Sequence, residues 1–193
     1  MQTLARTAIA RLPSVRSESQ LSEILAPWLT RRSVGPGHLQ DPGPSGLELN
    51  LMLAAAGNVS DHGRLRPCRI AVVSSEQRER LAEAFLRYAA SVRRLLSLDA
   101  LDEATQENEC EKAFNAPCLL AVLARIDAAN PEVPAHEQWI SVGASLGGLM
   151  SSANALGYAG KALSGARAAH PAVQAVLCEP FEVLVCFVYI GSR

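Results

Sequence analysis

Residues 117–124 read Pro-Cys-Leu-Leu-Ala-Val-Leu-Ala, a proline followed by an unbroken apolar run. A second run, Val-Leu-Val-Cys-Phe-Val-Tyr-Ile, occupies residues 183–190 close to the end of the chain. Short apolar runs next to turn residues are typical of strands that are covered on both faces of a sheet. The two runs therefore predict strands over 118–124 and 183–190, and we expect the second to be central rather than at an edge.

The segments around these runs alternate between helical and extended patterns. Apolar residues at three- and four-residue steps predict helices over 19–32, 46–56, 75–97, 135–156 and 171–177, and the acidic stretch 99–112 predicts a helical flap. Further short strands are predicted at 69–73 and 158–163, and the stretch 35–44, rich in Gly and Pro, predicts a loop. We therefore expect one α+β domain over 19–193, preceded by an N-terminal extension over 1–18.

Composition limits the classes of function. The chain has 193 residues, is 49% hydrophobic and carries a net charge of −1, so it can bury a core and has no general electrostatic basis for binding nucleic acid or an anionic membrane. No apolar run is long enough to span a bilayer. Residues 1–16 are basic and lack acidic residues, as in transit peptides, but we interpret them as an arm that frays or embraces a partner.

The side chains with intrinsic reactivity form no recognisable motif. The five cysteines are odd in number and lack metal-site spacing, so we interpret them as reduced thiols, mostly in the core, of a cytoplasmic protein. A nucleophile motif, a dinucleotide fingerprint and a P-loop are all absent from the sequence. We therefore predict no catalytic side chain and no metal ligand, and we expect any reactive group to arrive as a cofactor.

Three glycines, Gly143, Gly147 and Gly148, fall within the predicted helix over 135–156. Each glycine in a helix costs about 1 kcal/mol relative to alanine. Such a cluster predicts that something packs unusually close to the helix, either another helix or a flat ligand.

Three fragments far apart in the sequence carry the functional information. They are Arg31-Arg32-Ser33, Asp61-His62-Gly63-Arg64-Leu65-Arg66-Pro67 and Phe187-Val188-Tyr189-Ile190-Gly191. A basic pair beside a hydroxyl suits a phosphate, because arginine offers a fixed fork of donors. In this order and spacing, the fragments resemble the nitroreductase family of flavoproteins, and most of all its short bacterial branch. The resemblance covers about Leu21 to Gly191, and the segments 133–139 and 155–158 share it.

The resemblance implies a fold, a cofactor and an assembly. The implied fold is a three-layer α+β sandwich in which helices flank a central, mostly antiparallel sheet. The implied assembly is a homodimer that binds FMN where the two subunits meet. NAD(P)H is then the hydride donor, and an electron-poor small molecule, such as a nitroaromatic or a quinone, is the acceptor.

Position by position, the resemblance also implies the flavin contacts. Arg31, Arg32 and Ser33 are implied to bind the FMN phosphate and the ribityl or pyrimidine edge. On its charge alone, Arg193 is a further candidate for the phosphate if the chain end folds back. Asn58 and His62 occupy the positions from which this branch reaches the flavin, His62 from the partner subunit. The segment Ala162-Leu163-Ser164-Gly165 is implied to lie along the isoalloxazine.

Simpler structural explanations remain open for these residues. Arg31 and Arg32 are also favourable charges at the end of a helix. His62 is also explained as a hydrogen-bonded turn residue beside Asp61, and Ser164-Gly165 as an ordinary turn.

Some positions depart from the pattern of the branch. Asn58 stands where the branch has Arg, Cys68 where it has Trp, and Ala162-Leu163 where it has Trp-Arg. Each lost charged hydrogen bond weakens FMN binding by about 1–3 kcal/mol, and the lost aromatic area adds a comparable amount. The alternative function is therefore a nitroreductase-fold dimer with weakened or lost FMN binding that binds another flat ligand or a protein partner.

Overall fold

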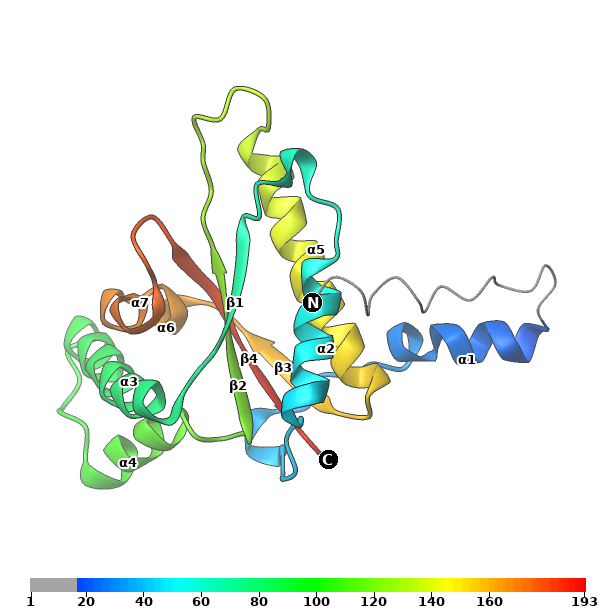
Figure 1. The fold of residues 1–193 in the computed structure, drawn as a ribbon. Coiled ribbons are helices and arrows are strands. Elements are labelled where there is room, and N and C mark those ends of the chain that lie inside the picture. The colour runs from blue at the N-terminus through cyan, green and yellow to red at the C-terminus, as the bar shows by residue number, and fades with distance from the viewer. Residues whose placement is uncertain (1–16) are drawn as a thin grey trace.

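The computed structural model describes residues 17–193, so residues 1–16 of the predicted extension over 1–18 lie outside the described part, while Ser17 and Glu18 belong to the start of the first helix. At its centre is an antiparallel sheet of four strands in the order β1-β2-β4-β3. These strands are β1 (Cys68–Val72), β2 (Cys118–Ala124), β3 (Ala159–Leu163) and β4 (Val183–Gly191). Helices cover both faces of the sheet, which confirms the predicted three-layer α+β sandwich (Figure 1).

Strands β2 and β4 form the middle of the sheet. Every residue of β2 is buried, and β4 pairs with β2 on one side and with β3 on the other. The predictions of a strand over 118–124 and of a central final strand are therefore confirmed, and β4 runs one residue further, to Gly191.

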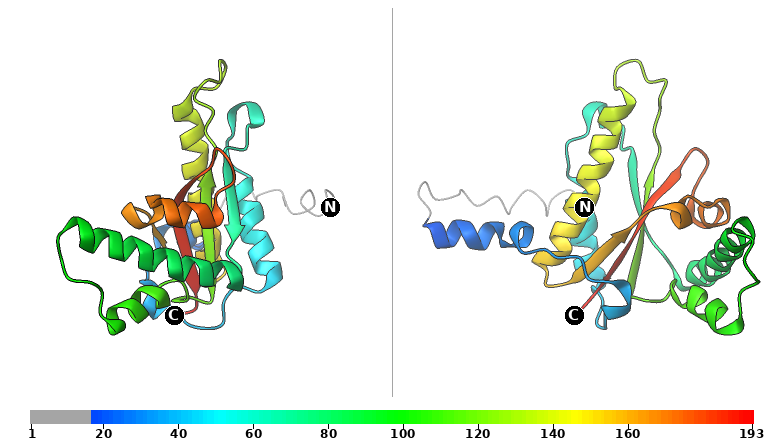
Figure 2. Two further views of the ribbon diagram at one scale, coloured as in Figure 1. Left: turned by 90° about the vertical axis from the view of Figure 1, so that its left-hand side faces the viewer. Right: turned by 180° about the vertical axis from the view of Figure 1, so that it is seen from behind.

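The two faces of the sheet carry separate hydrophobic cores. Helices α2 (Gly46–Gly57) and α5 (Ala135–Ala155) cover one face, where Met52 and Leu149 pack on Leu120 and Val188. On the other face lie α3 (Ser75–Leu95), α4 (Glu103–Glu111), α6 (Ala166–Ala169) and α7 (Pro171–Leu177) (Figure 2). Successive residues of β2 alternate between the two cores, as the pleat of a strand requires.

Serine residues set the start of three helices. The side chains of Ser17, Ser45 and Ser74 each accept a hydrogen bond from a backbone N–H in the first turn of α1 (Glu18–Leu29), α2 and α3, respectively. A Gln or Glu side chain in the same turn accepts a hydrogen bond from the backbone N–H of the serine. Such a capping box satisfies backbone groups that the helix leaves unpaired. None of the helices within 17–193 has the length and apolar content needed to cross a membrane.

The predicted helix over 19–32 is too long at its C-terminal end. Helix α1 stops at Leu29, so Arg31, Arg32 and Ser33 follow the helix instead of ending it. The sequence analysis also missed α6 and two 3-10 turns, Pro36–His38 and His62–Arg64. These elements are three or four residues long, and such lengths give no detectable periodicity.

The glycines of α5 divide into two groups. A Cβ atom at Gly148 would lie 3.1 Å from the carbonyl oxygen of Ala55, so this glycine lets α2 approach closely. This agrees with the close-helix explanation at Gly148. Gly143 and Gly147 have no such neighbour within 4 Å among the described residues.

A buried arginine fastens α3 to the segment before β2. Arg78 is only 9% exposed, and its guanidinium donates to the carbonyl oxygens of Ala113 (3.3 Å), Ala116 (2.8 Å) and Pro117 (3.1 Å). No acidic side chain of residues 17–193 pairs with it. Burial lowers the pKa of Arg78, but a group with so high an ordinary value stays charged at neutral pH.

Replacement of Arg78 should therefore destabilise the fold strongly. We expect Arg78→Ala to lower the free energy of unfolding by about 3 kcal/mol or more, because three carbonyl oxygens lose a charged donor. Arg78→Lys should recover only part of this loss, since an ammonium group lacks the planar fork. Chemical denaturation measures both, with the exposed Arg80→Ala on the same helix as a control. Equal stability of the Arg78 and Arg80 variants would contradict this role.

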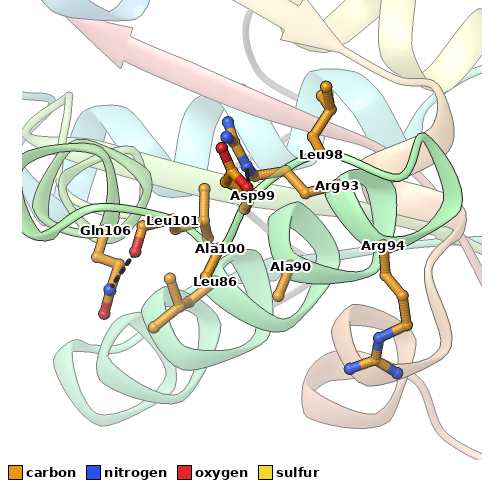
Figure 3. Close-up of a pocket in the computed structure, with 9 residues that line it drawn as sticks. All are labelled: Leu86, Ala90, Arg93, Arg94, Leu98, Asp99, Ala100, Leu101 and Gln106. Atoms are coloured by element: carbon orange, nitrogen blue, oxygen red, sulfur yellow. Dashed lines mark hydrogen bonds between the residues drawn. The ribbon is translucent and has the colours of Figure 1, made fainter.

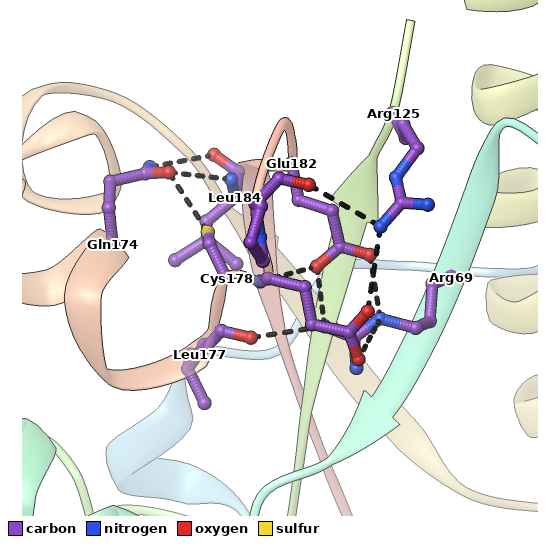
Figure 4. A network of polar contacts seen from close by, with 9 residues as sticks. Arg69, Arg125, Gln174, Leu177, Cys178, Glu182 and Leu184 are labelled. Atoms are coloured by element: carbon purple, nitrogen blue, oxygen red, sulfur yellow. Dashed lines mark hydrogen bonds and ion pairs between the residues drawn. The ribbon is translucent and has the colours of Figure 1, made fainter.

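An ion-pair network fastens the start of β4 to β1 (Figure 4). Arg69 Nη2 donates to Glu182 Oε2 at 2.6 Å and Arg69 Nε donates to Glu182 Oε1 at 2.8 Å. Arg69 Nη2 also donates to the carbonyl oxygen of Leu177, at 3.0 Å. The side chain of Glu182 is 4% exposed, and its hydrogen bond to Arg69 holds the pKa of the carboxyl below its usual range.

This network should make stability depend on pH in a defined direction. The pKa of Glu182 in the folded protein is depressed. The ion pair therefore contributes fully to the free energy of unfolding above the usual carboxyl pKa, and this contribution is lost as the pH falls through the lower pKa of the folded protein. We expect Glu182→Gln to cost about 2 kcal/mol at pH 7, and this difference should shrink below about pH 4. Denaturant titrations at several pH values measure it, with Glu79→Gln on the exposed surface of α3 as the control. A difference that does not vary with pH would rule out this linkage.

Candidate functional site

The segment that follows α1 lies along the outer edge of β3. Ser33 forms a parallel bridge with Gly160, and the N–H of Val34 donates to the Gly160 carbonyl oxygen at 3.3 Å. The strand pairing leaves no room for a side chain at position 160, because a Cβ atom there would lie 2.7 Å from the carbonyl oxygen of Tyr189. The close packing therefore requires glycine at position 160, and the backbone pairing with Gly160 holds Ser33 in place.

The two guanidinium groups of this segment are free of acidic partners among the described residues. Arg31 Nη1 donates to the Ser33 hydroxyl at 3.4 Å, and Arg32 Nη1 donates to the Arg31 carbonyl oxygen at 3.1 Å. Arg32 and Ser33 are exposed, and Arg31 is half-buried. Asn154 of α5 holds the end of α1 in place by donating to the carbonyl oxygen of Pro27 at 2.9 Å. The arrangement leaves two cations and a hydroxyl available to an anion.

A polar hollow of about 540 Å³ adjoins this segment. It is lined by Thr30, Asn154, Gly157, Tyr158, Ser192 and Arg193. Antiparallel hydrogen bonds between Ser192 and Gln40, at 2.8 and 2.9 Å, hold the chain end here. Arg193 therefore shares a hollow with Thr30, the residue before Arg31, and no carboxylate side chain lines it.

The predicted segment 162–165 continues from the same strand. Ala162 and Leu163 belong to β3, while Ser164 and Gly165 are exposed beyond its end. Gly165 has a φ of +107°, which strongly favours glycine, and nothing lies within 4 Å of the place where a Cβ atom would stand. Because Ser33 pairs with the same strand, this structure brings Arg31–Ser33 and Ala162–Gly165 to one edge of the sheet.

Asn58 and His62 lie elsewhere. Asn58 caps the end of α2, and His62 Nδ1 lies 2.6 Å from Glu137 Oε2 in the first turn of α5. The alternative explanation placed His62 beside Asp61, but its hydrogen-bond partner is Glu137, and Asp61 instead accepts from the Arg66 N–H at 2.8 Å.

The length of helix α5 gives the separation between His62 and the segment that follows α1. Glu137 holds His62 at its first turn, and Asn154 holds the end of α1 at its last turn. At 1.5 Å per residue, these two positions are about 25 Å apart. One subunit therefore does not bring His62 and Arg31 together.

A smaller hollow, of about 260 Å³, lies beside Cys68. Asp61, Arg66, Ser141 and Ser145 contribute to its lining. Burial raises the pKa of the Cys68 thiol, so the thiol stays protonated at neutral pH. The side chain of Cys68 is part of the lining of this space.

Two sets of polar residues were missed by the sequence analysis. Glu137 contacts His62, which lies 75 residues away, and no local pattern links the two. Glu109 and Arg167, whose side chains meet at 2.7 Å, come from elements 58 positions apart, and no local pattern links them.

The groove at the far end of α3 contains none of the predicted site residues. It has a volume of about 500 Å³ and lies between α3, the following loop and α4, with Leu86, Arg93, Leu98 and Gln106 in its lining (Figure 3). It lies on the opposite side of the sheet from α1 (Figure 1).

Comparisons with known proteins agree with this arrangement. A family model described as "Nitroreductase family" matches residues 29–192. The protein named "Putative NAD(P)H nitroreductase YdjA" of Escherichia coli strain K12 is 29% identical over 169 residues, or 85% of each chain. "Putative NAD(P)H nitroreductase" of Haemophilus influenzae is 30% identical over 155 residues, or 80% of each chain. The crystal structure of the FMN-dependent nitroreductase NfnB from Mycobacterium smegmatis in complex with NADPH superposes with a TM-score of 0.66 at 16% identity, covering 90% of this chain and 89% of NfnB.

Proposed function

This chain belongs to the nitroreductase family, and on that premise we propose that it is an FMN-dependent oxidoreductase. It passes hydride from NAD(P)H through the flavin to an electron-poor small molecule of the nitroaromatic or quinone type. The observation that carries the proposal is the single edge of the sheet along which Arg31–Ser33 and Ala162–Gly165 lie. We propose a cytoplasmic location, where NAD(P)H is available. The names of the relatives, NAD(P)H nitroreductases, support the donor.

The residues present fit a phosphorylated flavin. Arg31, Arg32, Ser33 and Arg193 provide cationic and hydroxyl donors for the phosphate, with no opposing carboxylate side chain in the adjoining hollow. The open backbone at Ser164 and Gly165 leaves room for a flat ring beside the strand. When bound, FMN supplies the hydride chemistry, and the protein holds, orients and shields it.

We propose further that the protein acts as a homodimer. Helix α1 extends from the side of the molecule that carries α2 and α5 (Figure 1), and its large apolar residues are between 45% and 65% exposed. Further exposed apolar side chains are Leu47 and Leu51 on α2 and Ile140 on α5, and the bare positions Gly143 and Gly147 also lie on α5. An exposed apolar surface of this extent is typical of a protein interface.

A dimer also explains the separation of the site residues. His62 is too far from Arg31 of its own subunit to contact the same flavin. The partner subunit's His62 and the partner subunit's Asn58 complete each site in the proposed assembly. Each of the two flavins then contacts both chains.

A second function is favoured by specific residues. Asn58, Cys68, Ala162 and Leu163 replace larger or charged groups of the resembled branch, and Cys68 lines a hollow. The second candidate is therefore a nitroreductase-fold dimer with weak or lost FMN binding that holds another flat ligand or a protein partner. A protein that is colourless as purified and retains no FMN after soaking would favour this candidate.

The visible spectrum of the purified protein tests the proposed cofactor. We expect a flavin band that bleaches when NAD(P)H is added. The double substitution Arg31→Ala with Ser33→Ala should weaken FMN affinity about 100-fold, because a charged and a neutral hydrogen bond to phosphate are both lost. Fluorescence titration with FMN measures this, with Arg87→Ala on the outer surface of α3 as control. Unchanged affinity would refute the phosphate assignment.

The assembly is tested by charge placed on the exposed apolar surface. Leu47→Glu with Leu51→Glu should weaken self-association about 100-fold, since an interface then buries unpaired carboxylates. Sedimentation velocity measures this change, and flavin retention should fall with it. The control is Leu95→Glu, which changes a leucine on α3 that is still more exposed. A dimer that survives the double substitution, or that Leu95→Glu also dissociates, would contradict the assignment of this surface.

A further inference from the structure

A separate hollow, which shares only Leu163 and Ser164 with the proposed flavin contacts, lies on the face of the sheet opposite α2 and α5. It has a volume of about 290 Å³, close to the lower limit for small-molecule pockets. Aromatic residues Tyr88, Phe187 and Tyr189 line it, together with Leu163 and Arg167. Its boundary includes Ser164, so it opens beside the end of β3.

Arg167 is the charged residue in the lining of the hollow, and it shares its acidic partner with a second cation, so the cluster around Glu109 carries excess positive charge. Arg167 Nη2 donates to Glu109 Oε2 at 2.7 Å, while Lys112 pairs with the other oxygen of the same carboxylate. One carboxylate, only 13% exposed, therefore serves two cations. Lys161 adds a further positive charge on the same face of β3 as Leu163, because alternate residues of a strand share a face.

The guanidinium of Arg167 is held in place and retains unused donors. It lies 5.0 Å from the ring centroid of Phe85 and 5.6 Å from that of Tyr88, which are favourable cation–π distances. Glu109 accepts only from Nη2, and Nε is buried without a hydrogen-bond partner among the described residues. A donor group that packing already orders loses little entropy when it binds a ligand.

The aromatic side chains of the hollow offer no competing charge. The Tyr189 hydroxyl donates to the carbonyl oxygen of Lys112 at 3.0 Å, and burial raises the pKa of Tyr189 to about 12, so this group is neutral. The rings of Phe187 and Tyr189, with centroids 6.4 Å apart, give the hollow an aromatic lining.

We propose that this hollow is a binding site for a small aromatic carboxylate. A carboxylate matches the excess positive charge and the free donors of Arg167. An aromatic ring matches the side chains that line the remainder of the hollow. Arg31, Arg32 and Ser33 do not line this space, whereas Leu163 and Ser164 belong both to the hollow and to the proposed flavin contacts. The binding test therefore reports flavin content as well.

Benzoate is the probe, with benzyl alcohol as its uncharged analogue of similar shape. Ligand-observed NMR and calorimetry on the full chain as purified should show saturable binding of one benzoate per chain, at least about tenfold tighter than that of benzyl alcohol. The visible spectrum of the same samples reports flavin content, so a failure of the proposed cofactor is seen separately. Absence of saturable benzoate binding, or equal binding of the two probes, would overturn the proposal.

Variants separate recognition by Arg167 from a structural role. Arg167→Gln should weaken benzoate binding about tenfold, and Glu109→Gln should strengthen it several-fold, because the competing carboxylate is gone. The control Arg87→Gln, on the exposed surface of α3, should leave it unchanged. A purely structural Arg167 does not predict tighter binding in Glu109→Gln, so unchanged or weaker binding there overturns the proposal.

A steric variant keeps the test decisive if Arg167→Gln fails to fold. Ala166 lines the hollow and is exposed, so Ala166→Leu fills the space without altering the Glu109 ion pair. Benzoate binding should fall at least about tenfold in this variant. Binding that persists unchanged in Ala166→Leu would place benzoate elsewhere and overturn the proposal.

Discussion

Strand β4 is the constraint on which the candidate site depends. It forms the antiparallel ladder with β2 on one side and is the only strand that pairs with β3 within residues 17–193. Strand β3 in turn holds Ser33 through Gly160, and Arg193 follows two residues after the end of β4. The close contact between Gly160 and the Tyr189 carbonyl oxygen permits no side chain at that point. The position of every proposed phosphate ligand therefore derives from the hydrogen bonds of one buried strand.

On the face of the sheet that α3, α4, α6 and α7 cover, arginine side chains hold the elements together in addition to apolar packing. Arg78 holds the chain before β2 through three carbonyl oxygens, and Arg69 holds the start of β4 through Glu182. Glu109 joins α4 to α6 through Arg167. Each arginine links elements that are distant in sequence, where apolar contacts alone leave the relative positions less defined. The hollow lined by Arg167 lies between elements that these arginines link, an arrangement that suits specific binding.

The sequence predicted the regular elements well and the polar contacts poorly, for physical reasons. The run over 118–124 defines β2 to the residue, because burial on both faces imposes an unbroken apolar pattern. Pro27 indicates a bent or shortened helix, but the stop of α1 at Leu29 was not predictable, since helix ends depend on local capping and on contacts such as the one from Asn154. The partner of His62 was also not predictable: Glu137 is 75 residues away and adjoins it only because α5 begins beside that turn. Resemblance to a family supplied the candidate site residues, whereas composition and periodicity supplied the layers.

The bridge between Ser33 and Gly160 has a further consequence for the behaviour of the sheet. Strand β3 lies at one margin of the sheet, where backbone N–H and C=O groups without neighbours can recruit a strand from another molecule. The residues after α1 occupy part of that margin and so compete with such recruitment. The segment that carries the two arginines thereby also protects the protein against edge-to-edge aggregation, and loss of its docking exposes a template for cross-β growth.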